Sequence, residues 1–139
     1  MSSNLKIDSL VEFVDIYPTL CELAGLPLPG HLEGVSAVPL MENPDLPWKA
    51  AAFSQFLREG IWVAPDGIEY MGYSVRTDRY RYVSWVTWET RELVAQELYD
   101  HETDPHETQN LADRPEHAAR LAELERVRQS GWRAALPER

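Results

Sequence analysis

Residues 70–88 read YMGYSVRTDRYRYVSWVTW and predict a β-hairpin. Two segments rich in aromatic and β-branched residues, Tyr70–Arg76 and Tyr80–Trp88, are typical of strands, and the polar segment 77–79 suits a tight connection between them. Side chains alternate between the two faces of a strand, so one face of the second strand carries Tyr80, Tyr82, Ser84, Val86 and Trp88, and the other carries Arg81, Val83, Trp85 and Thr87. Because both sets include large apolar groups, we expect both faces of the sheet to be covered.

Further strands are predicted on either side of this hairpin. Residues 51–57 predict a strand before it, and residues 97–100 predict a short strand after it. Residues 60–67 predict a long loop that ends in a turn at Pro65-Asp66-Gly67. The region therefore predicts a small antiparallel sheet of about four strands.

A helix is predicted after a polar turn. Asp113 and Glu116 fit a variant of the capping box, with Pro115 in the first turn, where its missing N–H costs nothing. An apolar stripe at helical spacing would pack this helix on the sheet; its members are Ala118, Leu121, Leu124 and Trp132. The residues after Gly131 are expected to fray.

The N-terminal part predicts a short helix followed by a linker. Asp15 is expected to be the N-cap of a helix over Asp15–Ala24, and Gly25 supplies the left-handed residue that ends it. Residues 26–48 hold five of the ten prolines, so we expect neither a helix nor a central strand there. The fold class is thus α+β, divided into 1–25 with the short helix, 26–48 as the proline-rich linker, and 49–139 with the sheet and C-terminal helix.

Composition and charge exclude several classes of function. The chain of 139 residues carries a net charge of −10, which repels polyanions and argues against nucleic-acid binding. Its apolar runs are too short for a membrane helix, so no membrane partner is expected, and the N-terminus shows no secretory signal. The single cysteine, Cys21, excludes an internal disulfide, and its apolar helical neighbours predict a buried, unreactive thiol.

Two short segments partly match motifs with a chemical function, a calcium-binding loop and a serine nucleophile, but each lacks residues that its motif requires. Residues 100–107 alternate acidic residues as a calcium loop does, but Pro105 stands where that loop needs glycine and Leu111 where it needs glutamate. We expect instead a polar turn whose carboxylates bind local backbone amides, and no metal. Residues 72–76 begin like the nucleophile elbow of serine hydrolases, but Arg76 replaces its closing glycine, so Ser74 is expected to be an ordinary strand residue.

Four arginines create a positive region in this acidic chain, namely Arg58, Arg76, Arg79 and Arg81. A guanidinium group matches the geometry of carboxylate and sulfate, so these residues are candidates for binding an anion. The alternative is that they only solvate one face of the sheet or pair with neighbouring acids such as Asp78 and Glu69.

The linear order of several segments resembles the C-terminal part of sulfatases. The N-terminal segment VDIYPTLCELAGLP (14–27) resembles the one that opens the last third of these enzymes, and ELYD (97–100), DPHE (104–107) and NLA (110–112) resemble their C-terminal signature. Segments 54–58, 71–77 and 80–82 are similar to the iduronate-2-sulfatase branch. The resemblance covers almost the whole chain.

This resemblance implies an alkaline-phosphatase-like fold, of which residues 1–25 would end the catalytic α/β domain and 49–139 would form the C-terminal subdomain. The parent enzyme would hydrolyse a sulfate ester of a carbohydrate such as a glycosaminoglycan, using calcium and a formylglycine made from a C-x-P-S-R motif. This chain has no such motif, since Cys21 is followed by Glu22-Leu23-Ala24. The resemblance therefore implies a chain that is inactive alone, with no cofactor of its own, and whose partner is the missing catalytic domain.

In the family this subdomain borders the active-site mouth, which makes Arg58, Trp62, Tyr73 and Arg76 the candidate substrate-side residues. Two other functions stay open at this point. The chain could be a stand-alone carbohydrate- or sulfate-binding module with Trp62, Tyr73 and Trp88 as a stacking platform. It could also belong to a related phosphonate or phosphodiester hydrolase.

Overall fold

The computed structural model describes residues 6–58 and 66–137. The chain divides into two compact units, one made of the residues up to Ala50 with those after Ala135, and one made of Ala51–Ala135. Each unit is described by itself. None of the helices in the described ranges has the length and apolar character needed to cross a membrane.

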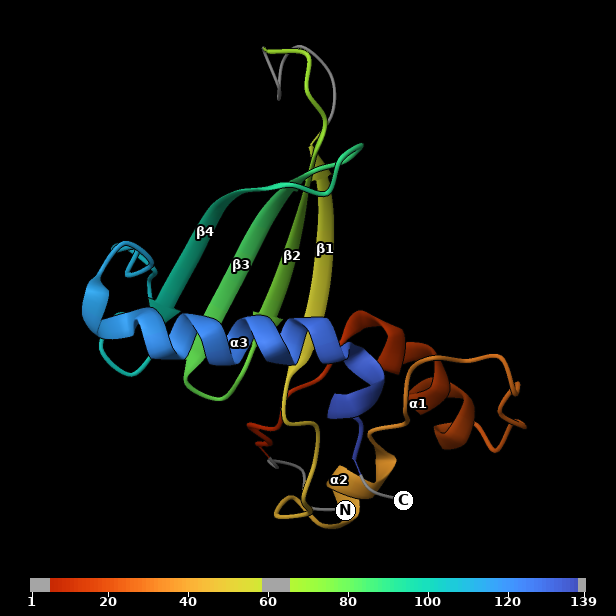
Figure 1. The fold of residues 1–139 in the computed structure, drawn as a ribbon. Helices are drawn as coiled ribbons and strands as arrows, with labels where there is room; N and C mark the ends of the chain where they lie inside the picture. Colours follow the sequence, from red (N-terminus) through yellow and green to blue (C-terminus); the bar gives the residue numbers. More distant parts are fainter. Residues whose placement is uncertain (1–5, 59–65, 138–139) are drawn as a thin grey trace. The chain divides into compact units, whose positions relative to one another are not determined.

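The second unit is built on a four-stranded antiparallel sheet in which each strand pairs with the next one along the chain (Figure 1). The strands are β1 (Ala52–Arg58), β2 (Tyr70–Arg76), β3 (Tyr80–Thr87) and β4 (Leu93–Asp100). The predicted hairpin is confirmed, since β2 and β3 pair from Tyr70 opposite Thr87 to Arg76 opposite Arg81. The α+β fold class is confirmed as well.

Strand β4 is longer than the sequence predicts, because it begins at Leu93 rather than at residue 97. Its first half pairs with β3 across a β-bulge, where Trp85 faces Ala95 and the next residue, Val86, faces Leu93. A bulge places two residues against one and shifts the alternation of faces. Residues 93–96 carry no clear alternating pattern, so only pairing with β3 defines this part of the strand.

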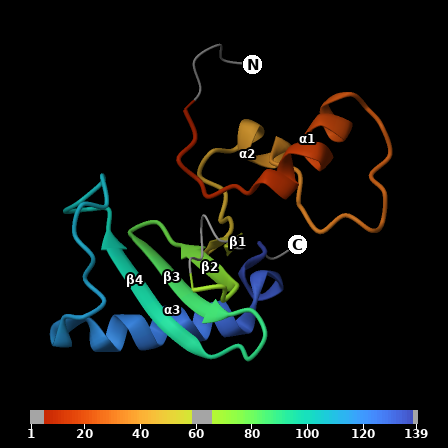
Figure 2. The same cartoon turned by 90° about the horizontal axis from the view of Figure 1, so that it is seen from above.

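One face of the sheet is covered by helix α3 (Ala118–Ser130), which lies across the strands in both views (Figures 1 and 2). Leu124 of α3 is buried with Tyr82, Leu98 and Leu111, and this cluster is the main core of the unit. The predicted capping box is wrong: a 3-10 turn, η2 (Pro115–His117), precedes α3, and no side chain caps either element.

A second, smaller core lies at the end of α3. The segment after Gly131 forms a 3-10 turn, η3 (Trp132–Ala135), and Ala135 is buried against Ala51 and Val75. The predicted fraying of this segment is therefore wrong, because a small apolar residue fits between the edge of β1 and the buried residue of β2.

The first unit contains three short elements, η1 (Phe13–Asp15), α1 (Ile16–Leu23) and α2 (Val38–Glu42). Helix α1 lies where the sequence predicts it and ends as predicted at Gly25, which has a φ of 66°. Helix α2 contradicts the expectation that residues 26–48 hold no helix. Pro39 falls in its first turn, where a backbone N–H has no helical partner, so the proline does not disrupt it.

Asp15 stands at the N-cap position of α1, as the sequence predicts, but its carboxylate does not bond the first turn of that helix; the residue is buried, with only 2% of its surface exposed. Its carboxylate accepts hydrogen bonds from the backbone N–H of Val35 at 2.9 Å and from Lys49 Nζ at 2.8 Å to each oxygen. Lys49 Nζ also bonds Glu12 at 2.5 Å. The hydrogen bond from Val35 and the ion pair with Lys49 thus hold the proline-rich segment and the residue that follows it against the start of α1.

Cys21 is buried in α1, as predicted from its apolar neighbours. The outward surface of this helix is different. A series of large apolar side chains in and around α1 is half or more exposed: Val11, Phe13, Val14, Ile16, Tyr17, Leu20, Leu23 and Leu26. We refer to these eight residues as the α1 apolar surface.

Candidate functional site

The connection between β3 and β4 carries Trp88 and Arg91, which form a cluster with Tyr73 from the middle of β2. The Arg91 guanidinium stacks over the Trp88 ring, with its central carbon 4.3 Å from the ring centroid. Arg91 Nη1 donates a hydrogen bond of 2.9 Å to the Tyr73 hydroxyl. We call these three residues the Arg91 cluster.

The backbone holds Arg91 in place. Arg91 has a φ of 61°, in the left-handed region that side-chain-bearing residues seldom adopt, and its N–H bonds the carbonyl of Thr87 at 3.0 Å. The Thr87 hydroxyl accepts from the N–H of Glu92 at 3.1 Å, which closes the same turn. The turn therefore presents the Arg91 side chain at a fixed point.

A hollow of about 840 Å³ lies beside this cluster. Its walls come from the two strand connections and consist of Gly67, Ile68, Glu69, Thr87, Trp88, Glu89, Thr90, Arg91 and Glu92. The first of these walls is anchored by Tyr70, whose hydroxyl donates to Asp66 at 2.6 Å. This hydrogen bond lowers the pKa of Asp66 and raises that of Tyr70.

The arrangement is suited to binding a sugar. An exposed indole offers a flat apolar surface on which a pyranose ring can stack, and a guanidinium group binds carboxylate or sulfate through paired hydrogen bonds. The carboxylates of Glu69, Glu89 and Glu92 can accept hydrogen bonds from hydroxyl groups.

A second arginine–tryptophan pair lies on the opposite face of the sheet. The Arg58 guanidinium is 4.4 Å from the centroid of the Trp85 ring, and that ring lies flat on Gly72. Any β-carbon at Gly72 would be within 3 Å of the ring, so the close approach requires glycine. Trp85 Nε1 donates to Glu97 at 2.7 Å.

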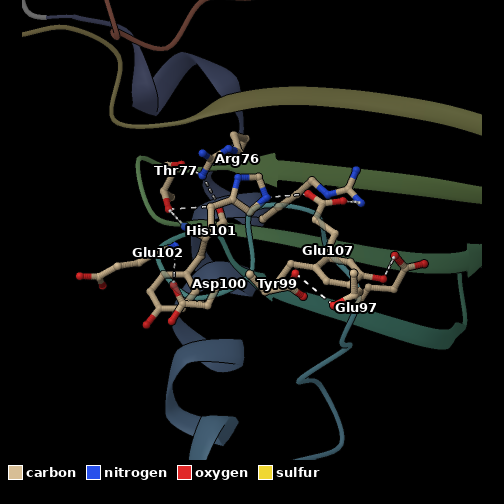
Figure 3. Close-up of polar contacts among 12 residues, drawn as sticks. Arg76, Thr77, Glu97, Tyr99, Asp100, His101, Glu102 and Glu107 are labelled. Atoms are coloured by element: carbon tan, nitrogen blue, oxygen red, sulfur yellow. Dashed lines mark hydrogen bonds and ion pairs between the residues drawn. The ribbon is translucent and has the colours of Figure 1, made fainter.

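Glu97 links this pair to a polar network that runs along the same face (Figure 3). The Tyr99 hydroxyl donates to Glu97 at 3.0 Å, and the Arg81 guanidinium lies over the Tyr99 ring. Arg81 forms an ion pair with Glu107, which also bonds His101 Nε2 at 2.6 Å. The carboxylates of this face are thus bound within the protein.

In the acidic turn at residues 100–107, two carboxylates accept hydrogen bonds from local backbone amides, as the sequence predicts. Asp100 accepts from the N–H of Glu102 at 3.1 Å, and Asp104 accepts from the N–H of Gln109 at 2.9 Å. Asp100 is also held by two hydrogen bonds from Arg79. Within residues 6–58 and 66–137, no group of three or more His, Cys, Asp or Glu side chains could hold a metal ion.

The Arg79–Asp100 pair predicts a specific response to acid. The hydrogen bonds from Arg79 hold the pKa of Asp100 below its usual value, so the pair stabilises the fold above the pKa of the unfolded carboxyl, about 3.9, and this contribution is lost as the pH falls further. We expect Asp100→Asn to lower the free energy of unfolding at pH 7, and the difference from the unmutated chain to shrink toward pH 2. Urea titrations across this range measure it.

The matched control for this prediction is Asp78→Asn, since Asp78 is exposed in the turn between β2 and β3. The control should stay close to the unmutated chain at every pH. A stability difference for Asp100→Asn that stays constant between pH 7 and pH 2 would contradict the role given to its charge.

The structure does not bring the three described candidate substrate residues, Arg58, Tyr73 and Arg76, together. Arg58 and Tyr73 belong to neighbouring strands but lie on opposite faces of the sheet, since Arg58 pairs with Tyr70. Arg76 lies at the other end of β2, where its guanidinium bonds the carbonyls of Thr77 and Tyr80 (Figure 3). Trp62 lies outside the described residues. Arg79 and Arg81 pair with acids, although not with Asp78 or Glu69.

Arg91 was not predicted, and the sequence offers little signal for it. It follows a threonine and precedes a glutamate, in a segment that reads as an ordinary polar connection. Only the turn geometry and the bulge in the β3–β4 pair bring it to Trp88 and Tyr73.

Among residues 6–58 and 66–137, no set of side chains fits the calcium ion or the formylglycine that the sulfatase resemblance implies. Cys21 is buried inside α1 and lacks the modification motif. The acidic side chains of the 100–107 turn are bound to Arg79, Arg81 and local amides. No chemical step through either group is therefore derived for this chain.

Comparison with known proteins identifies the family. Residues 1–130 match the family described as N-sulphoglucosamine sulphohydrolase, C-terminal. Mouse iduronate 2-sulfatase is 32% identical across 89% of this chain, and arylsulfatase K from Rattus norvegicus is 33% identical across 81%. The chain spans 29% and 19% of the length of these two relatives.

Solved structures agree with this relationship. A putative sulfatase from Bacteroides thetaiotaomicron has a TM-score of 0.66 at 30% identity, over 84% of this chain and 23% of that one. A 2-O GAG sulfatase has a TM-score of 0.65 at 30% identity, with the same coverage. In both comparisons the chain corresponds to a minor part of the larger protein. The fold, the order of its motifs and the match over residues 1–130 together show that this chain belongs to the sulfatase C-terminal domain family.

Proposed function

We propose that this chain serves as the C-terminal part of a sulfuric ester hydrolase, similar to iduronate 2-sulfatase, that acts on a sulfated carbohydrate. In this role it contributes structure and one wall of the substrate cleft and is inactive alone. Calcium and formylglycine would belong to the catalytic domain of the complete enzyme.

The observation that carries this proposal is the family match over residues 1–130, combined with the small share of each relative that the chain spans. The relatives include a delta 4,5-hexuronate-2-O-sulfatase from Bacteroides thetaiotaomicron, which is 33% identical across 79% of this chain. That name supports a sulfated uronic-acid glycan as the substrate of the complete enzyme.

Within the cleft, we propose that the end of the sheet at the β1–β2 and β3–β4 connections faces the glycan. Arg58 is the substrate-side candidate at that end, Tyr73 is a candidate in the middle of β2 on the other face, and Arg76 is one at the opposite end of β2. Trp62, the fourth candidate, lies outside the described residues. The stacking of Arg58 on Trp85 supports the choice of Arg58, because it holds a guanidinium at the surface where an anionic substrate could reach it.

A sulfate-release assay tests the proposal. The chain alone and the chain joined to the catalytic part encoded with it are each incubated with 2-O-sulfated disaccharides, and sulfate is measured by ion chromatography. We expect release only from the joined form, and a lower kcat/KM when Arg58 is changed to Gln. Sulfate release by the chain alone, or a joined enzyme that cleaves only phosphate or phosphonate esters, would contradict it.

The α1 apolar surface is the proposed contact with the catalytic domain. Contiguous exposed apolar groups of this kind mark protein interfaces or cause aggregation. We expect the chain alone to self-associate, and the combined change of Ile16, Leu20 and Leu23 to Ser to reduce this strongly. Sedimentation velocity measures the effect.

Helix content, followed by circular dichroism, confirms that the serine variant is still folded. The matched control is Val94→Ser, which removes a half-exposed apolar group from β4. A chain that is monomeric without any substitution would contradict this assignment of the surface.

One observation favours the alternative of a stand-alone binding module. Two of its three predicted platform residues, Tyr73 and Trp88, are joined by Arg91 beside a hollow. Glycan binding by the chain alone that is unchanged when the catalytic part is joined, with no sulfate release from either form, would support the module instead.

A further inference from the structure

We propose that the hollow beside the Arg91 cluster binds one singly charged acidic sugar ring, which stacks on Trp88 and places its carboxylate or sulfate group on Arg91. This inference deepens the proposed function, on which it rests for the choice of a glycan as the ligand. It names the kind of sugar unit that this end of the sheet holds.

The first argument is the charge of Arg91. Among the described arginines, Arg79, Arg81, Arg120 and Arg128 form ion pairs with carboxylates, whereas Arg58, Arg76 and Arg126 contact only a ring or backbone carbonyls. Arg91 forms none among the described residues, although Glu89 and Glu92 are its near neighbours and the chain has 23 acidic residues. Within the described residues its guanidinium stacks on the Trp88 ring and donates one hydrogen bond, to the Tyr73 hydroxyl, so most of its N–H donors remain for a ligand.

The second argument is that the cluster is fixed before any ligand arrives. The left-handed backbone at Arg91 is strained for a non-glycine residue, and such strain is retained at sites with a function. The stacking on Trp88 and the bond to Tyr73 hold the guanidinium, and Arg128 of α3 lies over the Tyr73 ring at 5.4 Å. Preorganisation of this kind lowers the entropy cost of binding.

The third argument concerns size and polarity. A hollow of about 840 Å³ is within the range of small-ligand sites, and Trp88 keeps 40% of its surface exposed at the edge. Three glutamates in the walls can accept hydrogen bonds from hydroxyl groups but repel additional anionic groups. The site therefore favours a ring with a single negative charge over one that carries several sulfates.

The test is a ¹⁵N NMR titration of the full chain that follows the indole N–H of Trp88, assigned with Trp88→Phe. The probes are an unsulfated disaccharide containing glucuronic acid, a disaccharide of uncharged sugars that carries a single 2-O-sulfate, the fully sulfated uronate disaccharide, neutral N-acetyllactosamine and inorganic sulfate. We expect the two singly charged disaccharides to bind at least tenfold more tightly than the other three. The first two probes show whether carboxylate or sulfate is preferred.

Variants connect the binding to the cluster. Arg91→Asn keeps a residue that tolerates left-handed backbone and should weaken binding at least tenfold. Tyr73→Phe removes only the hydroxyl and should weaken it several-fold. The control Arg126→Gln changes an exposed arginine of α3 and should have no effect.

Four results would overturn the proposal: binding of N-acetyllactosamine, of inorganic sulfate or of the fully sulfated disaccharide as tight as that of the singly charged disaccharides, or an Arg91→Asn variant that binds like the unmutated chain. Because the readout is binding rather than turnover, it is separate from the proposed function. Sugar binding without sulfate release from the joined enzyme would reject the proposed function alone. Sulfate release from the joined enzyme without sugar binding at the Arg91 cluster would reject this inference alone.

Discussion

Asp15→Ala is expected to lower the free energy of unfolding of the N-terminal unit by about 3–5 kcal/mol. The side chains of Asp15 and Lys49 are 3% and 1% exposed, so the substitution leaves a buried ammonium group with one remaining carboxylate partner, Glu12. It also removes the acceptor for the backbone N–H of Val35. An unpaired buried charge and an unpaired buried amide each cost far more than a surface ion pair contributes.

Urea unfolding and hydrogen exchange at the Val35 amide measure this effect. The matched control is Asp8→Ala, which breaks an ion pair to Lys6 whose two side chains are more than 80% exposed, and which should change the stability little. Lys49→Met should also destabilise the unit. The two substitutions together should cost less than the sum of their separate effects, because they remove both charges of one pair. Equal effects of Asp15→Ala and Asp8→Ala would contradict the buried-pair interpretation.

Gly34→Ala is expected to cost about 3 kcal/mol by forcing apart two backbone segments. A β-carbon at residue 34 would lie 2.0 Å from the carbonyl oxygen of Val14 and 2.4 Å from its carbonyl carbon. Backbone atoms cannot rotate away as the end of a side chain can, so the segment must move, and the neighbouring bond from Val35 to Asp15 would be lost with it.

Gly30→Ala is the control for this substitution, because a β-carbon at residue 30 meets nothing within 4 Å. That variant should be as stable as the unmutated chain or slightly more stable, since alanine reduces the freedom of the unfolded chain. Thermal unfolding of the two variants side by side measures the difference. Similar stabilities would show that the 31–36 segment does not pack on the residues before α1.

The sheet could be predicted from the sequence where local chemistry and pairing agree. Tyr70–Arg76 was predicted with its observed limits, because its β-branched and aromatic residues end at a polar turn. The sequence does not predict the first half of β4, because Leu93-Val94-Ala95-Gln96 shows no alternation of apolar and polar residues and depends on pairing with β3 for its definition. Helix α2 was missed because prolines in sequence do not reveal that Pro39 falls in a first turn.

The helix caps and the site show a different limit. Asp15 and Asp113 both match the preferences of an N-cap, but Lys49, 34 residues away, binds the first, and the second does not cap a helix. The Arg91 cluster depends on a left-handed residue and a bulge. Contacts between residues distant in sequence decide these features, so neither spacing nor composition could predict them.

The order of the sheet, in which every strand pairs with its neighbour in the chain, has a consequence for how the unit acquires its structure. Pairing two neighbouring strands closes only a short loop, so the chain loses little conformational entropy when the pair forms. The strand pairs can therefore form one after another along the chain. The β2–β3 turn is the shortest connection and is the natural nucleus. We expect the β2–β3 hairpin to form before α3 packs on the sheet, so that substitutions near Thr77 slow refolding and substitutions in α3 mainly accelerate unfolding.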